Sequence, residues 1–133
     1  MKFIAFMICL FSLTAFADDG FGIIHSNELD TWMTKESKTV HVYDANNDKT
    51  RTKNGIIPGA TTLASAHDYS VATLPANKSD KLVFYCANEG CMASHDAAKV
   101  AVKAGYAHVF VMADGIEGWK KAGKKTRTYN MKM

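Results

Sequence analysis

The chain of 133 residues is 47% hydrophobic and has only two prolines, so it can bury a core without a disulfide scaffold. Its formal net charge is +3, from 16 basic and 13 acidic residues scattered along the chain. Such a small and dispersed charge argues against a nucleic-acid partner, and the basic residues over 120–132 are most simply a solvated terminus.

Residues 1–17 have the pattern of a cleavable signal peptide. Lys2 precedes an apolar run over 3–16, and Ala15-Phe16-Ala17 is the small-x-small pattern that signal peptidase reads. The alternative is a membrane anchor, but the run is shorter than the about 18 to 20 residues that span a bilayer, and no basic segment follows it. We therefore expect an exported protein, periplasmic or secreted, with no membrane attachment after cleavage.

Removal of residues 1–17 leaves 116 residues, the length of one domain over 18–133. The excised segment contains Cys9 and one lysine, so the net charge falls to +2 and Cys86 and Cys91 remain. Because exported thiols meet an oxidising compartment, this pair calls for a chemical explanation.

The first half of this domain contains short predicted elements. Capping and β-branched residues predict a helix over 27–33 capped by Ser26, a strand over 39–43 ending at Asp44, and a loop over 46–48. Turn residues and their spacing then predict a Gly/Pro turn over 55–60, a strand over 61–64, and an irregular stretch over 65–80 with room for a partial helix before Pro75.

The second half has clearer signals. Segments 82–85 and 109–112 lack polar alternation, which is typical of strands buried on both faces of a parallel sheet. Apolar periodicity predicts helices over 94–104 and 116–121. Strands that alternate with helices predict an α/β fold in three layers, with a mainly parallel central sheet and helices on both faces.

Cys86 directly follows the strand over 82–85, and a seven-residue loop (87–93) separates it from the helix that we expect to begin at Ser94. Ligands of parallel sheets bind beyond the carboxyl ends of the strands. Free backbone N–H groups of the loop and the helix start are expected to face this point and to lower the pKa of the Cys86 thiol. The alternative is a buried, inert cysteine.

Several short motifs occur in an order and spacing that resemble a rhodanese domain over about residues 23–123. They are Val42-Tyr43-Asp44, Gly55-Ile56-Ile57-Pro58-Gly59-Ala60, Phe84-Tyr85-Cys86, Ala97-Ala98, Gly105-Tyr106 with Val109, and Gly115-Ile116 with Trp119.

The resemblance implies a rhodanese-like fold in which Cys86 takes up sulfane sulfur as a persulfide and passes it to a thiol or cyanide, without a cofactor. The partner is then a small sulfur compound or a thiol or persulfide carrier protein. Asp44 matches a family Asp that makes structural hydrogen bonds near the active loop; the alternative is an exposed surface Asp.

The substrate-binding loop departs from the family pattern. Its residues are Ala87, Asn88, Glu89, Gly90, Cys91, Met92, Ala93 and Ser94, which include one acid and no cation. Cys91 stands where the family commonly has Arg or Lys, and Met92 stands where a related phosphatase branch needs Arg. Thiosulfate, a dianion, would find little attraction here, so we expect polysulfide or another persulfide carrier to be preferred.

Cys91 leaves three interpretations open. It can resolve a Cys86 persulfide or sulfenic acid into a Cys86–Cys91 disulfide, which would make the domain a dithiol redox protein. It can be a packed loop residue. It can also join Cys86 and His95 as ligands of a soft metal, in a non-catalytic sulfide- or metal-binding module, although the three side chains would have to converge.

Overall fold

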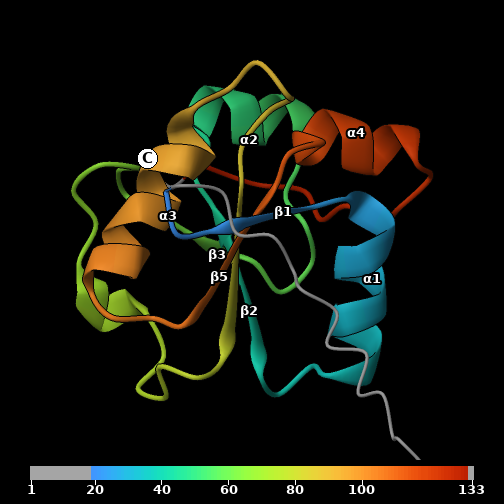
Figure 1. Cartoon of the computed structure of the whole chain (residues 1–133). Helices are drawn as coiled ribbons and strands as arrows, with labels where there is room; N and C mark the ends of the chain where they lie inside the picture. Colours follow the sequence, from blue (N-terminus) through green and yellow to red (C-terminus); the bar gives the residue numbers. More distant parts are fainter. Residues whose placement is uncertain (1–18, 132–133) are drawn as a thin grey trace, which may run out of the picture.

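Five short strands form one parallel sheet in the computed structural model, which describes residues 19–131 (Figure 1). In spatial order they are β1 (Gly22–Ile24), β5 (His108–Met112), β4 (Lys81–Tyr85), β2 (Val40–Asp44) and β3 (Thr61–Thr62). The central strand β4 pairs with β2 on one side and β5 on the other. Because the strands are parallel, their carboxyl ends meet at one edge of the sheet.

Helices cover both faces of this sheet. Within the described residues they are α1 (Ser26–Lys35), α2 (Asp48–Asn54), the 3-10 helix η1 (Val71–Thr73), α3 (Ala93–Lys103) and α4 (Gly115–Lys121). Figure 1 shows α3 on one side of the sheet and α1 on the other. This arrangement confirms the predicted α/β class.

The side chains of β4 alternate between two cores. Leu82 and Phe84 pack into the core that contains α3, whereas Val83 and Tyr85 pack into the core that contains residues of α1 and α4. All four are 0% exposed. Full burial of one such apolar side chain contributes about 1.5–3 kcal/mol, which explains why this strand has no polar alternation.

The predicted N-cap at Ser26 is wrong. The helix α1 begins at Ser26 itself, and the preceding His25 makes no capping bond with its side chain. Instead, Asp114 accepts hydrogen bonds from the backbone N–H and the hydroxyl of Ser26, both at 2.8 Å. A carboxylate is favoured at the positive end of a helix, and here it comes from a segment 88 residues away.

Two elements were missed by the sequence analysis. Residues 46–48 were expected to form a loop, but Asn47 caps α2 by accepting from Thr50 N at 2.9 Å, and the helix begins at Asp48. The segment DKTRTKN has no apolar stripe, so helical periodicity could not reveal it. The other missed element, β1, has three residues and pairs with β5 at the sheet edge.

The remaining boundaries differ from prediction by one or two residues, as is common at the ends of elements. The strand expected over 61–64 is shorter, at Thr61–Thr62, and the helix expected from Ser94 begins at Ala93. The partial helix before Pro75 is η1.

The expected signal peptide, residues 1–17, lies outside the described residues, so its cleavage and the export of the protein stay predictions. Over residues 19–131, no helix has the length and apolar character needed to cross a membrane.

Candidate active site

Cys86 lies at the carboxyl end of the central strand β4 and is 1% exposed. Six residues, 87–92, connect it to α3, one fewer than predicted. The start of α4 anchors the beginning of this loop: Ile116 N–H donates to the Cys86 carbonyl at 2.8 Å, and Glu117 N–H donates to the Ala87 carbonyl at 3.0 Å. The backbone before Cys86 is therefore held by strand β4, and the backbone that follows it is held by the start of α4.

This anchor depends on a glycine. Gly115 has a φ of +67°, a left-handed conformation that L side chains rarely adopt. A Cβ atom there would overlap the backbone of Ala87 and Asn88. The close approach of α4 to the loop therefore requires glycine at this position.

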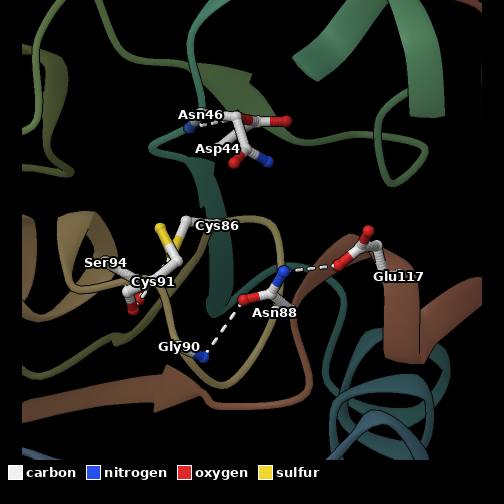
Figure 2. The surroundings of a disulfide bond; sticks show 8 residues. All are labelled: Asp44, Asn46, Cys86, Asn88, Gly90, Cys91, Ser94 and Glu117. Atoms are coloured by element: carbon white, nitrogen blue, oxygen red, sulfur yellow. Dashed lines mark hydrogen bonds between the residues drawn. A yellow bond between two sulfur atoms is a disulfide. The ribbon is translucent and has the colours of Figure 1, made fainter.

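Cys86 and Cys91 are joined by a disulfide, with their Cα atoms 6.3 Å apart (Figure 2). The Ser94 hydroxyl oxygen lies 3.3 Å from Cys86 Sγ. The Cys91 carbonyl oxygen lies at the same distance, so in the reduced state it can accept a hydrogen bond from the Cys86 thiol. The loop thus places a second sulfur, a hydroxyl and a carbonyl around Cys86.

Two of the loop N–H groups that were expected to face Cys86 are used within the loop. Gly90 N–H donates to Asn88 Oδ1 at 3.1 Å (Figure 2). Cys91 N–H donates to the Asn88 carbonyl, also at 3.1 Å. The Asn88 side chain also donates to Glu117 Oε2 at 2.6 Å. The N–H groups of Gly90 and Cys91 are therefore not available to Cys86, because Asn88 organises the turn.

The charges beside the loop are mostly negative. Glu89, Asp114 and Glu117 line a groove of about 520 Å³ together with one cation, Lys121 of α4. The Asp114 carboxylate is engaged by Ser26, as above, and by His25, whose Nδ1 lies 2.8 Å away. This hydrogen bond raises the pKa of His25 above its ordinary value.

Asp44 lies in a buried polar network beside the site. It is 0% exposed and accepts from Arg51 Nε at 3.2 Å, from Asn46 N–H at 2.8 Å and from the Tyr85 hydroxyl at 2.7 Å. The Tyr85 hydroxyl in turn accepts from Ile57 N–H at 3.0 Å, and burial raises the pKa of this phenol. Asp44 is thus not an exposed surface residue.

Arg51 completes the network and was not singled out from the sequence. Its guanidinium is 5% exposed and also donates to the carbonyls of Asp44 at 2.9 Å and Leu63 at 2.8 Å. The sequence contains only an indirect signal for this role of Arg51. A carboxylate at the end of a buried strand, such as Asp44, needs a cation or several hydrogen-bond donors near it. Arg51 is the basic residue of α2 whose side chain bonds to Asp44 in the structure, and the spacing along the chain does not identify it.

Asn46 is a second residue that the sequence analysis did not single out. Ala45 N–H donates to the Tyr85 carbonyl at 2.9 Å, so the chain after β2 continues alongside Cys86. Figure 2 shows Asn46 in the surroundings of the disulfide. Within the described part of the chain, its side-chain nitrogen is buried without a hydrogen-bond partner.

The suggested metal ligands do not assemble. The ring of His95 packs edge-on against Phe21, with 5.4 Å between the ring centroids. Over residues 19–131, no three His, Cys, Asp or Glu side chains are grouped so that they could hold a metal ion. Cys86 and Cys91 are brought together, whereas His95 is not part of a ligand set with them.

Comparisons with known proteins agree on the fold. A protein of Bacillus halodurans is 20% identical, with 82% of this chain and 77% of that chain covered and a TM-score of 0.70. The rhodanese-like domain of an Anabaena protein is 21% identical, with 83% and 80% covered and a TM-score of 0.63. A thiosulfate sulfurtransferase of Pseudomonas aeruginosa is 18% identical, with 81% and only 20% covered and a TM-score of 0.65.

No curated protein matches the chain. The sequence model of the rhodanese-like domain matches residues 25–122, which is most of the chain and includes Asp44, Cys86, the loop and Gly115. The chain therefore belongs to the rhodanese-like domain family.

Proposed function

We propose that this protein is a sulfurtransferase that carries sulfane sulfur as a persulfide on Cys86 and delivers it to a thiol or cyanide. The observation that carries the proposal is the place of Cys86: it directly follows the central strand β4, and the start of α4 holds its carbonyl. A persulfide needs donors distributed around its sulfurs. The Ser94 hydroxyl and the unpartnered Asn46 amide, described above, are neutral candidates for that task.

Removing each cysteine in turn tests this proposal. In reduced protein, Cys86→Ser is expected to abolish sulfur transfer from polysulfide to cyanide, because the sulfur-accepting thiolate is gone. Cys91→Ser is expected to retain transfer. Both variants lose the disulfide, so each controls for its absence in the other. Thiocyanate formation and intact mass give the readout, and equal loss in both variants would contradict a mechanism centred on Cys86.

The disulfide supports a second candidate, a dithiol redox protein. Cys86 and Cys91 form a disulfide in the structure, and such a bond can exchange two electrons with a dithiol partner. This candidate differs from sulfur transfer in one measurable way. A redox protein would reduce or oxidise a partner's cysteines through both residues, and Cys91→Ser would then abolish activity.

The charge of the loop supports a preference for polysulfide, or another persulfide carrier, over thiosulfate. Glu89 is exposed beside the site and repels a dianion. Glu89→Lys is expected to raise kcat/KM for thiosulfate several-fold, with less gain at high ionic strength. Glu89→Gln should give a smaller gain, because it removes repulsion without adding attraction. If wild type uses both donors equally and neither variant changes kcat/KM, the charge argument is wrong.

We propose the partner to be a small sulfur compound or a thiol or persulfide carrier protein outside the cytoplasm. The dispersed charge of the chain and the signal-peptide pattern support this assignment.

A further inference from the structure

The two sulfurs of the disulfide differ in access from solvent. Cys86 is 1% exposed, whereas Cys91 lies on the loop, is partly exposed and follows the exposed residues 88–90. A nucleophile that arrives from solvent therefore meets Cys91 first. In disulfide exchange the attacked sulfur forms the new bond, and the other sulfur leaves as a thiolate.

A hydroxyl beside the Cys86 sulfur can stabilise Cys86 as a leaving thiolate. The Ser94 hydroxyl lies 3.3 Å from its sulfur and is itself in a residue that is 2% exposed. In the disulfide this hydroxyl is beside a neutral sulfur, but it can donate to the thiolate once the S–S bond breaks. Hydrogen bonds to a charged group are stronger than those to a neutral one, so the contact favours departure of Cys86.

The surroundings limit which nucleophile fits. Glu89, Asp114 and Glu117 oppose the single cation Lys121 in the adjacent groove, and residues 87–94 contain no cation. A dianion is disfavoured there. Inorganic sulfide is a small monoanion that near neutral pH is in equilibrium with uncharged H₂S. These carboxylates therefore repel it less than they repel a dianion.

We infer that the Cys86–Cys91 disulfide takes up inorganic sulfide at Cys91. The sulfur of hydrosulfide forms a bond to Cys91 Sγ while the bond between Cys86 and Cys91 breaks. The electron pair of the broken S–S bond stays on Cys86, which leaves as a thiolate. The products are a Cys91 persulfide and the Cys86 thiolate. The sulfide sulfur is oxidised to sulfane level and the disulfide supplies the oxidising equivalent, so no other oxidant enters this step.

The later fate of the sulfur rests on the proposed function. The Cys86 thiolate attacks the outer sulfur of the Cys91 persulfide, Cys91 leaves as a thiolate, and the Cys86 persulfide of the transfer reaction results. After an acceptor thiol has taken that sulfur, both cysteines are reduced. An external disulfide, on a protein or a small molecule, then restores the pair by exchange and is itself reduced to two thiols.

Sulfide uptake by the whole protein tests the inference. Disulfide-form protein, given sodium sulfide without oxygen or any sulfane donor, is expected to gain the mass of one H₂S molecule. Protein reduced beforehand is expected to gain nothing, because it holds no oxidising equivalent. Absence of uptake by the disulfide form, or equal uptake by the reduced form, would overturn the inference without touching Cys86 loading from polysulfide.

Single-cysteine variants test the site of attack without scrambling between sulfurs. In Cys86→Ser the remaining Cys91 is capped as a methyl disulfide, and in Cys91→Ser the remaining Cys86 is capped in the same way. Sulfide is expected to convert capped Cys91 to a persulfide at least about ten-fold faster, because access controls exchange. If capped Cys86 forms a persulfide as fast as capped Cys91, the assignment of Cys91 as the attacked sulfur is wrong. Circular dichroism of both variants checks that each is folded.

Discussion

Arg51→Met is expected to lower the free energy of unfolding by about 3–5 kcal/mol, because it leaves Asp44 as an unpaired charge in the interior. Asp44 is 0% exposed, and the Arg51 guanidinium also donates to the backbone carbonyls of two buried residues, Asp44 and Leu63, which would lose this donor. Urea unfolding followed by tryptophan fluorescence measures the effect.

Lys53→Met is the matched control for this change. Lys53 lies on the same helix α2 but is exposed, so its replacement is expected to change stability by less than about 0.5 kcal/mol. A double variant, Asp44→Asn with Arg51→Met, should recover part of the loss because the unpaired charge is gone. If Arg51→Met and Lys53→Met behave alike, the buried pair does not stabilise the fold.

Sequence patterns predicted the middle of this fold well because burial on both faces leaves an unambiguous signal. The segments 82–85 and 109–112 correspond to β4 and β5, and the position of Cys86 after β4 followed from them. The family and the α/β class are confirmed by the match over residues 25–122 and by the parallel sheet.

The features that were missed depend on contacts between distant segments. The cap on Ser26 comes from Asp114, and the partner of Asp44 comes from a helix without an apolar stripe. The hydrogen bonds of the loop N–H groups could not be predicted either, because the side chain of Asn88 accepts from the N–H group of Gly90 within the loop. Spacing along the chain placed Cys86 at the end of a strand, but only the fold reveals what surrounds it.

Gly115→Ala is expected to impair both stability and reactivity. The positive φ of Gly115 costs an alanine about 1–2 kcal/mol, and its Cβ would also overlap the backbone of Ala87 and Asn88. To relieve the overlap, α4 must move away from the loop and weaken the bonds from Ile116 and Glu117 to the carbonyls of residues 86 and 87. We expect a loss of at least about 2 kcal/mol and a several-fold lower rate of sulfur loading on Cys86.

Gly123→Ala separates the two causes. Gly123 also has a positive φ, +77°, but a Cβ there has nothing within 4 Å. It therefore carries the backbone strain without the overlap, and it lies beyond α4, away from Cys86. Urea unfolding measures the free energy of unfolding of both variants, and the difference between them is the cost of the overlap. Intact mass after polysulfide treatment measures the rate at which Cys86 is loaded with sulfur. If Gly115→Ala costs no more than Gly123→Ala and loads at the wild-type rate, the close approach of α4 is not what positions the Cys86 loop.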